Sequence, residues 1–178
     1  MNFTINKTNE MGGNQMAKHS DTYYYQRTVE LAREAMDKGN DGFASLLVSP
    51  EGDILLEHTN VVKECVDVTA HDTIMLVREA IKKYPASYLK ECTVYAMMEP
   101  CIMCMGAIYW ANIGTVNFAI SEEEYSIMRG GGGLEIHSKE FAQRCGKDIR
   151  IIGPSAECHD MVLESIKEHI RRKTEAAK

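Results

Sequence analysis

Two short stretches, Thr69-Ala70-His71-Asp72-Thr73 and Pro100-Cys101-Ile102-Met103-Cys104, decide how this chain is expected to fold and where its chemistry lies. His71 lies 30 residues before Cys101, and Cys104 follows three residues after Cys101. One histidine and two cysteines are ligands that zinc prefers, and three protein ligands leave a fourth position open, as in catalytic zinc sites. The spacing therefore predicts a zinc site formed by His71, Cys101 and Cys104.

Each stretch is expected at the beginning of a helix. Thr69 is a candidate N-cap for a helix that ends before Tyr84-Pro85, and Pro100 suits the entry of a second helix over residues 101–112. The positive ends of the two helix dipoles would help to keep both thiols deprotonated, as metal binding requires.

Outward from these helices, the rest of the chain alternates between helices and strands. Strands are predicted at 43–48, 54–57, 92–97, 115–120 and 149–152, further helices at 21–38 (capped by Asp21 or Thr22) and 155–173, and a flexible loop at Gly130–Gly133. This alternation is typical of a three-layer α/β domain with a sheet of about five strands.

Length and composition favour one domain. Residues 1–20 are polar and rich in Gly and Asn, which predicts a disordered N-terminal extension, and residues 21–178 are expected to form a single domain. The 44% hydrophobic and 26% charged fractions are those of a soluble globular protein. Because the chain has neither an apolar run of about 18 residues nor the apolar core of a signal peptide, we expect no membrane partner and a cytoplasmic location.

Neither the charge of the chain nor its remaining cysteines indicate a nucleic-acid-binding site or a second metal site. The formal net charge of −6 argues against general nucleic-acid binding, and Arg171-Arg172-Lys173 is interpreted as a solvated helix end. Cys65, Cys92, Cys145 and Cys158 are scattered singly, as buried apolar thiols often are. Tyr23-Tyr24-Tyr25 is expected to pack within a helix, with a stacking surface as the alternative.

The residues around both halves of the zinc motif resemble the cytidine deaminase superfamily, and within it the guanine deaminase and bacterial tRNA adenosine deaminase branch. The matching residues are Val68-Thr69-Ala70-His71 before Ile74-Met75-x-x-Arg78, Glu99-Pro100-Cys101-x-x-Cys104-x-Gly106-Ala107-Ile108, Gly42-Phe43-Ala44, and Asn60 after the second strand. The resemblance covers residues 24–175. It implies a five-stranded sheet sandwiched between helices (a three-layer α/β/α sandwich of the cytidine deaminase-like fold), one zinc ion per active site, and a homodimer or higher assembly.

The resemblance also assigns roles to individual residues. His71, Cys101 and Cys104 would bind zinc, and Asn60 would hydrogen-bond a heterocyclic base, although a lone asparagine is equally compatible with a turn. Phe43 and the backbone around Ala70 and Glu99 would line the pocket. In the family, zinc lowers the pKa of its bound water, which then attacks a ring carbon that carries an amino group, while a glutamate transfers the protons.

The chain departs from the family at that glutamate. Alignment on His71 places Asp72 where the family usually has alanine, and Thr73 where it has the glutamate. Threonine is no base near neutral pH, so another acid would have to carry the proton. Asp72 is adjacent, but consecutive helix residues point about 100° apart, and a first-turn carboxylate also simply favours a helix N-terminus. Glu135, after the glycine loop, is the better-placed candidate, because guanine deaminases have an assisting acidic residue in that later segment, although Glu135 also fits an exposed surface position.

Thr73 is compatible with two further interpretations. The substrate could supply its own proton acceptor or carry a better leaving group than ammonia, or the protein could be a catalytically silent relative that binds a ligand or an active subunit. An artificially inactivated form would be expected to change the glutamate alone.

The sequence favours a zinc-dependent hydrolytic deaminase of a purine-like nucleobase, nucleoside or related nitrogen heterocycle, with a non-standard proton carrier. The last helix is similar to the tail of tRNA deaminases, so tRNA is the lesser alternative, but the acidic run Glu122-Glu123-Glu124 would repel phosphate.

Overall fold

The computed structural model describes residues 18–134, 136–176 and 178. Within them the strands are β1 (Ala44–Val48), β2 (Ile54–Thr59), β3 (Thr93–Met98), β4 (Thr115–Ile120) and β5 (Arg150–Ile152). The helices are α1 (Asp21–Asp37), α2 (Val62–Cys65), α3 (Asp72–Lys83), α4 (Ala86–Leu89), α5 (Ile102–Ala111), α6 (Glu122–Met128), α7 (Ser138–Arg144) and α8 (His159–Ala176). None of these helices combines the length and the apolar character needed to cross a membrane.

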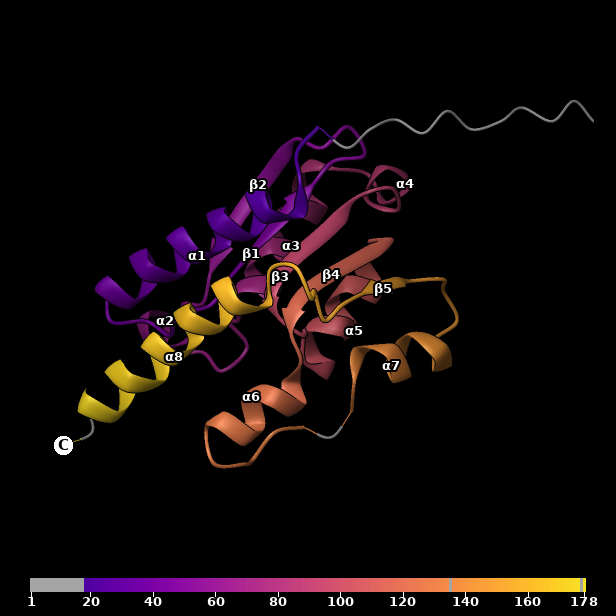
Figure 1. Ribbon diagram of the computed structural model, residues 1–178. Coiled ribbons are helices and arrows are strands. Elements are labelled where there is room, and N and C mark those ends of the chain that lie inside the picture. Colours follow the sequence, from indigo (N-terminus) through magenta and orange to yellow (C-terminus); the bar gives the residue numbers. More distant parts are fainter. Residues whose placement is uncertain (1–17, 135, 177) are drawn as a thin grey trace, which may run out of the picture.

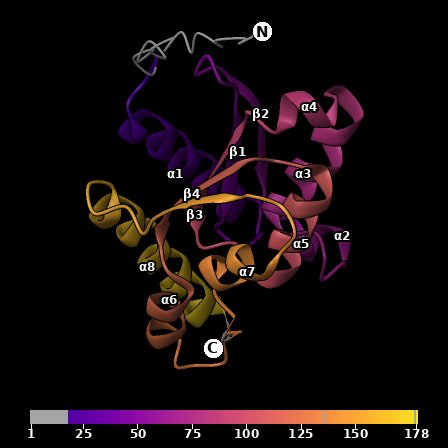
Figure 2. The ribbon, with the colours of Figure 1, turned by 90° about the vertical axis from the view of Figure 1, so that its right-hand side faces the viewer.

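The five strands form one mixed sheet in the order β2-β1-β3-β4-β5. β1 pairs antiparallel with both β2 and β3, whereas β3, β4 and β5 run parallel. Helices α1 and α8 cover one face of the sheet and helices α3 and α5 the other (Figures 1 and 2). The predicted three-layer α/β sandwich with about five strands is confirmed.

Alternating strand residues fill the two layers of core. In β1, Leu46 packs toward α1 and α8, and Leu47 packs toward α3 and α5. In β3, Tyr95 packs toward α1 and α8, and Val94 packs toward α3 and α5. All four side chains are buried, as expected for strands covered on both faces. The two layers of core therefore hold the sheet between the helices. The carboxyl ends of β3 and β4 lead directly into the loops that build the site.

Several predicted boundaries were wrong by a few residues. Ser20 caps α1 in place of Asp21 or Thr22, and His71 occupies the N-cap of α3 in place of Thr69. The Thr69 hydroxyl instead donates to Asp67 Oδ1 at 2.7 Å, within the turn before the helix. The last helix begins at His159 and not near residue 155. The predicted disordered extension falls mainly on residues 1–17, outside the described residues, and stays a prediction.

The prediction for the single cysteines was correct for Cys92 and Cys158, which are buried, but wrong for Cys65, which is exposed. Cys65 is exposed because it lies on the short surface helix α2, which contributes no buried residue. Of the three consecutive tyrosines, Tyr24 and Tyr25 are buried in the core and Tyr23 is 43% exposed. Helix packing therefore accounts for two of the three.

Candidate metal centre

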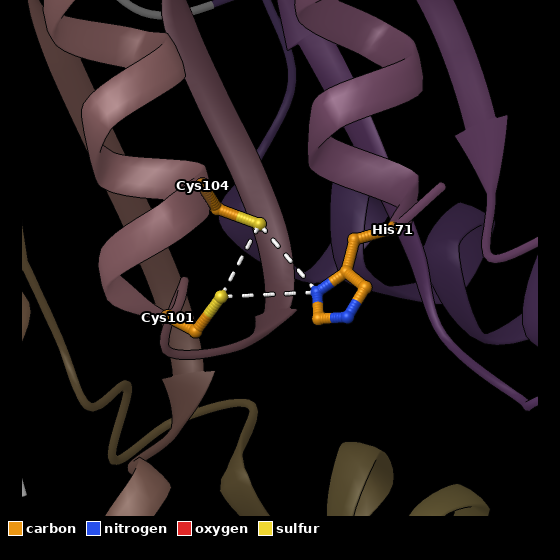
Figure 3. Close-up of side chains that lie close together, drawn as sticks. All are labelled: His71, Cys101 and Cys104. Carbon is orange, nitrogen blue, oxygen red and sulfur yellow. Dashed lines mark hydrogen bonds between the residues drawn. The ribbon is translucent and has the colours of Figure 1, made fainter. Parts of the chain in front are cut away.

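Three side chains from two helix N-termini converge at the end of the sheet. His71 is the N-cap of α3, Cys101 is the N-cap of α5, and Cys104 lies in the first turn of α5. His71 Nδ1 lies 3.8 Å from Cys101 Sγ and 3.7 Å from Cys104 Sγ, and the two sulfurs are 3.7 Å apart (Figure 3). Among the described residues, this is the one group of three or more His, Cys, Asp or Glu side chains close enough to share a metal ion.

The size of this triangle fits zinc. With Zn–S bonds of about 2.3 Å, Zn–N bonds of about 2.0–2.1 Å and tetrahedral angles, two sulfurs would lie about 3.8 Å apart and a sulfur and a nitrogen about 3.6 Å apart. The observed separations of 3.7–3.8 Å match these values. The donor set also suits zinc, since one imidazole and two thiols exclude the all-oxygen ligation that magnesium and calcium prefer.

The electrostatics of the two cysteines favour a thiolate. The hydrogen bond between the Cys101 and Cys104 side chains, together with the neighbouring His71, lowers the pKa of Cys101 to about 4. The same interaction and burial raise the pKa of Cys104, and the hydrogen bond with Cys101 raises that of His71. Cys101 is therefore the thiol that ionises more readily, and binding of a metal ion would displace the remaining protons of the ligands.

A cavity of about 470 Å³ opens on the metal-ligand triad. This volume lies within the range of small-molecule pockets. Apolar side chains form much of the wall: Phe43, Val62, Met97, Met98, Met103, Tyr125 and Leu134. Charged side chains also contribute: Asp41, Asp72, Glu99, Glu122, Arg129 and Lys173. Such a cavity can enclose a flat heterocycle and present hydrogen-bonding groups to its edge.

Asp72 and Thr73 both line this cavity, although their side chains leave the helix in different directions. They do so because the cavity wraps around the N-terminus of α3. The Thr73 hydroxyl donates to Asp72 Oδ2 at 3.3 Å, and Thr73 is only 2% exposed. Burial raises the pKa of Asp72. The structure thus places a carboxyl group beside Thr73, the residue that the resemblance aligns with the family's glutamate.

The other predicted site residues divide between the cavity and the scaffold. Phe43 and Asn60 line the cavity, whereas Ala70 is buried and is not part of the cavity wall; its N–H donates to Asp67 O and its C=O accepts from Val61 N. Asn60 Oδ1 accepts from Val62 N at 3.1 Å, so the described residues leave the amide nitrogen of Asn60 without a hydrogen-bond partner. Asn60 therefore forms a turn and still has a donor to offer to the cavity. Glu135 lies outside the described residues.

Sequence reasoning missed the wall supplied by helix α6. Glu122, Tyr125 and Arg129 line the cavity, and Arg129 lies 3.3 Å from Glu122 Oε1 and 5.0 Å from the centre of the Tyr125 ring. Burial raises the pKa of Glu122. Ser121 followed by Glu124 is a capping-box pattern that could have predicted the helix, and Ser121 Oγ accepts from Glu124 N at 3.2 Å.

The basic cluster near the C-terminus has two different environments. Arg172 pairs with Asp37 at 2.8 Å and with Glu168 at 2.6 Å, which supports the interpretation as a solvated helix end. Lys173, in contrast, lines the cavity and lies 4.0 Å from Asp41.

Residues 18–120, which include all three candidate ligands, match the model of the cytidine and deoxycytidylate deaminase zinc-binding region. The chain belongs to this deaminase family. Its family model describes a zinc-binding region, and the His71–Cys101–Cys104 triad is the group in the described chain that fits that metal.

Individual deaminases show how far the similarity extends. The chain is 38% identical to guanine deaminase of Bacillus subtilis over 96 residues, which cover 54% of this chain and 62% of that enzyme. It is 31% identical to the tRNA-specific adenosine deaminase of Aquifex aeolicus over 103 residues, covering 58% and 68% of the two chains. The chain thus spans less than two thirds of the Bacillus enzyme that it matches.

A solved structure supports the fold over a longer range. The guanine deaminase of Nitrosomonas europaea superposes with a TM-score of 0.71 at 18% sequence identity, covering 87% of each chain. The predicted cytidine deaminase-like fold is therefore confirmed. The match to the family model over residues 18–120 confirms the predicted family.

Proposed function

We propose that this protein is a zinc-dependent hydrolytic deaminase of a purine-like nucleobase, nucleoside or related nitrogen heterocycle. The observation that carries the proposal is the cavity of about 470 Å³ that joins the His71–Cys101–Cys104 triad to the carboxyl group of Asp72 and the side chain of Asn60. A metal site, a group able to carry protons and a hydrogen-bonding side chain thus share one cavity wall, as hydrolytic deamination requires.

His71 Nδ1, Cys101 Sγ and Cys104 Sγ would hold the zinc ion. When bound, zinc would act as a Lewis acid that activates water for attack on the ring carbon bearing the amino group. The rest of the chemistry falls to the protein. In the overall reaction, water replaces the amino group and ammonia leaves.

We assign the proton transfers to Asp72. Its carboxylate would accept a proton from the attacking water and deliver it to a ring nitrogen, and the Thr73 hydroxyl, which donates to Oδ2, would orient the carboxylate. Glu135 is the alternative proton carrier. Asp72 is preferred because it lies in the wall of the cavity, next to the ligand His71.

Substrate contacts follow from the remaining wall. The amide nitrogen of Asn60 would donate to a ring nitrogen or carbonyl oxygen, and Phe43, at a ring-centroid distance of 5.6 Å from Tyr125, would border the plane of the base. The names of the relatives support heterocycles of the guanine or adenosine type. A homodimer or higher assembly and a cytoplasmic location stay predictions.

Ammonia release from a panel of nucleobases, nucleosides and related heterocycles tests the proposal. Asp72→Asn in the zinc-loaded protein should lower kcat by about 10²–10⁴-fold, the usual contribution of general acid–base catalysis. Asp148→Asn, at an exposed position, is the matched control and should retain the wild-type rate. An unchanged rate in Asp72→Asn together with a loss in Glu135→Gln would transfer the role to Glu135.

A catalytically silent zinc-binding protein is the second candidate, and Thr73 is the observation that favours it. Its hydroxyl is buried at the position of the family's glutamate and is no base at neutral pH. If the zinc-loaded wild type releases ammonia from none of the compounds while Thr73→Glu gains activity, this second function holds.

Binding of tRNA is the lesser alternative, supported by the similarity to the Aquifex enzyme. A mobility shift of labelled tRNA that weakens steeply with salt would support it.

A further inference from the structure

We propose that Glu99 is a positioning residue whose buried carboxylate fastens both ends of the segment 121–138 and thereby holds one wall of the cavity in place for substrate binding. The proposal deepens the proposed function and rests on it for the kinetic part of its test.

The carboxylate of Glu99 is surrounded by donors from two separate elements. Oε1 accepts from the backbone N–H and from the hydroxyl of Ser138, both at 2.7 Å. Oε2 accepts from the backbone N–H of Glu122 at 3.2 Å and lies 3.4 Å from His137 Nδ1. With its side chain only 5% exposed, Glu99 thus binds the first residue of α6 and the first residue of α7 at the same time.

The segment between these two contacts supplies one side of the cavity. Tyr125, Arg129, Gly132 and Leu134 all line it. Figure 1 shows α6 and the chain after it lying beyond the end of the sheet, reached through the connection from β4. Gly130, Gly131 and Gly132 have φ angles of 88°, 101° and 86°, a backbone region that glycine adopts without strain. A run of glycines gives this wall little stiffness of its own, so its placement depends on how its ends are held.

Glu99 is itself held firmly. Its backbone N–H donates to Ile120 O at 2.8 Å, which continues the pairing of β3 and β4 by one residue. Cys101 follows two residues later. The same short loop therefore carries a candidate metal ligand, Cys101, and the carboxylate that holds the wall, and this connection sets the distance between Cys101 and the α6 wall.

The donor set explains why a carboxylate suits this position. Two backbone N–H groups and one hydroxyl point at the two oxygens, and an ionised carboxylate only accepts hydrogen bonds. The isosteric Glu99→Gln variant would direct its NH₂ group against a backbone N–H donor on one side. One end of the segment would then lose a charge-assisted hydrogen bond without any change in side-chain volume.

The test compares Glu99→Gln with Glu123→Gln in the zinc-loaded full chain. Glu123 is an exposed neighbour in the first turn of α6 and is the matched control. For the substrate found in the ammonia panel, Glu99→Gln should raise KM by about tenfold or more, as expected for one lost charge-assisted hydrogen bond. The value of kcat should change less and the zinc content should stay the same, whereas the control should match the wild type.

Limited proteolysis provides a second measurement that needs no activity. Cleavage of folded Glu99→Gln by a nonspecific protease within Gly130–Gly133 should be about tenfold faster than in the wild type, for the same lost hydrogen bond. Ser138→Ala removes the hydroxyl but keeps the backbone N–H donor, so it should give an intermediate effect. It also keeps the proposal testable if Glu99→Gln does not fold.

Unchanged KM and unchanged cleavage in Glu99→Gln would overturn the proposal. Loss of zinc with an equal loss of kcat would also overturn it, because Glu99 would then support the metal loop and not the wall. If the wild type releases no ammonia, the proposed function fails, while the cleavage rates still decide whether Glu99 fastens the segment.

Discussion

Tyr25→Phe is expected to destabilise the fold without affecting the metal centre, because the Tyr25 hydroxyl belongs to a buried hydrogen-bond network on the opposite face of the sheet. The hydroxyl donates to Asn117 Oδ1 at 2.8 Å, and Asn117 Nδ2 donates to Asp21 Oδ2 at 3.2 Å. Tyr95 donates to the other carboxylate oxygen of Asp21 at 2.6 Å. The network connects the first turn of α1 to β3 and β4.

The magnitude follows from what the substitution leaves behind. Tyr25 is 0% exposed and Asn117 is 2% exposed, so water cannot replace the missing hydroxyl without entering the core. Leaving one buried acceptor without its donor costs about 1–3 kcal/mol, and we expect a loss of about 2 kcal/mol in the free energy of unfolding. For a chain of this length, that loss lowers Tm by about 4–8 °C.

The consecutive tyrosines provide the control. Tyr23→Phe removes the same atom from a side chain that is 43% exposed, and it should leave stability nearly unchanged. Both variants should be unfolded by urea and by heat at the same excess of zinc, since bound metal adds to apparent stability. If Tyr25→Phe is no less stable than Tyr23→Phe, the hydroxyl network does not stabilise α1 against the sheet, and the prediction is refuted.

Two further outcomes are expected. Cys104→Ser should lose stoichiometric zinc by elemental analysis while the exposed Cys65→Ser retains it, and equal zinc in both variants would contradict the assigned ligands. Hydrogen bonding to Arg27 lowers the pKa of Glu57 from 4.5, so this pair stabilises the fold above that pH and loses its effect as the pH falls through the lower folded-state value. Urea unfolding of wild type and Glu57→Gln should therefore differ by about 0.2–1 kcal/mol at pH 7 and converge in acid, and a difference that grows in acid would refute the sign.

Local sequence patterns were sufficient to predict most of the strands and the longer helices. The predicted strands over 43–48 and 115–120 lie within one residue of β1 and β4, because each is an apolar run bounded by turn residues or a loop. The short helices α2, α4, α6 and α7 were not predicted. Each has four to seven residues, too few for a helical period to show in the sequence.

The sequence by itself predicted the three candidate metal ligands. His71, Cys101 and Cys104 could be proposed without coordinates, because Cys101 and Cys104 are three residues apart at one predicted helix N-terminus and His71 lies at another, and the triangle of 3.7–3.8 Å agrees with that prediction. The resemblance to the family also predicted that Thr73 stands where the family has a glutamate, but not which group could serve in its place.

Only the tertiary structure decided what surrounds the metal centre. Asp72 enters the cavity because the cavity wraps around the end of α3, a shape that no local pattern encodes. Glu122 and Ser138 meet the carboxylate of Glu99 from positions 23 and 39 residues away, because parallel β3 and β4 end side by side. The metal ligands could be predicted from their residue types, the Cys-x-x-Cys spacing and their places at helix N-termini, whereas the walls of the cavity come from segments that carry no such motif and that only the packed sheet brings together.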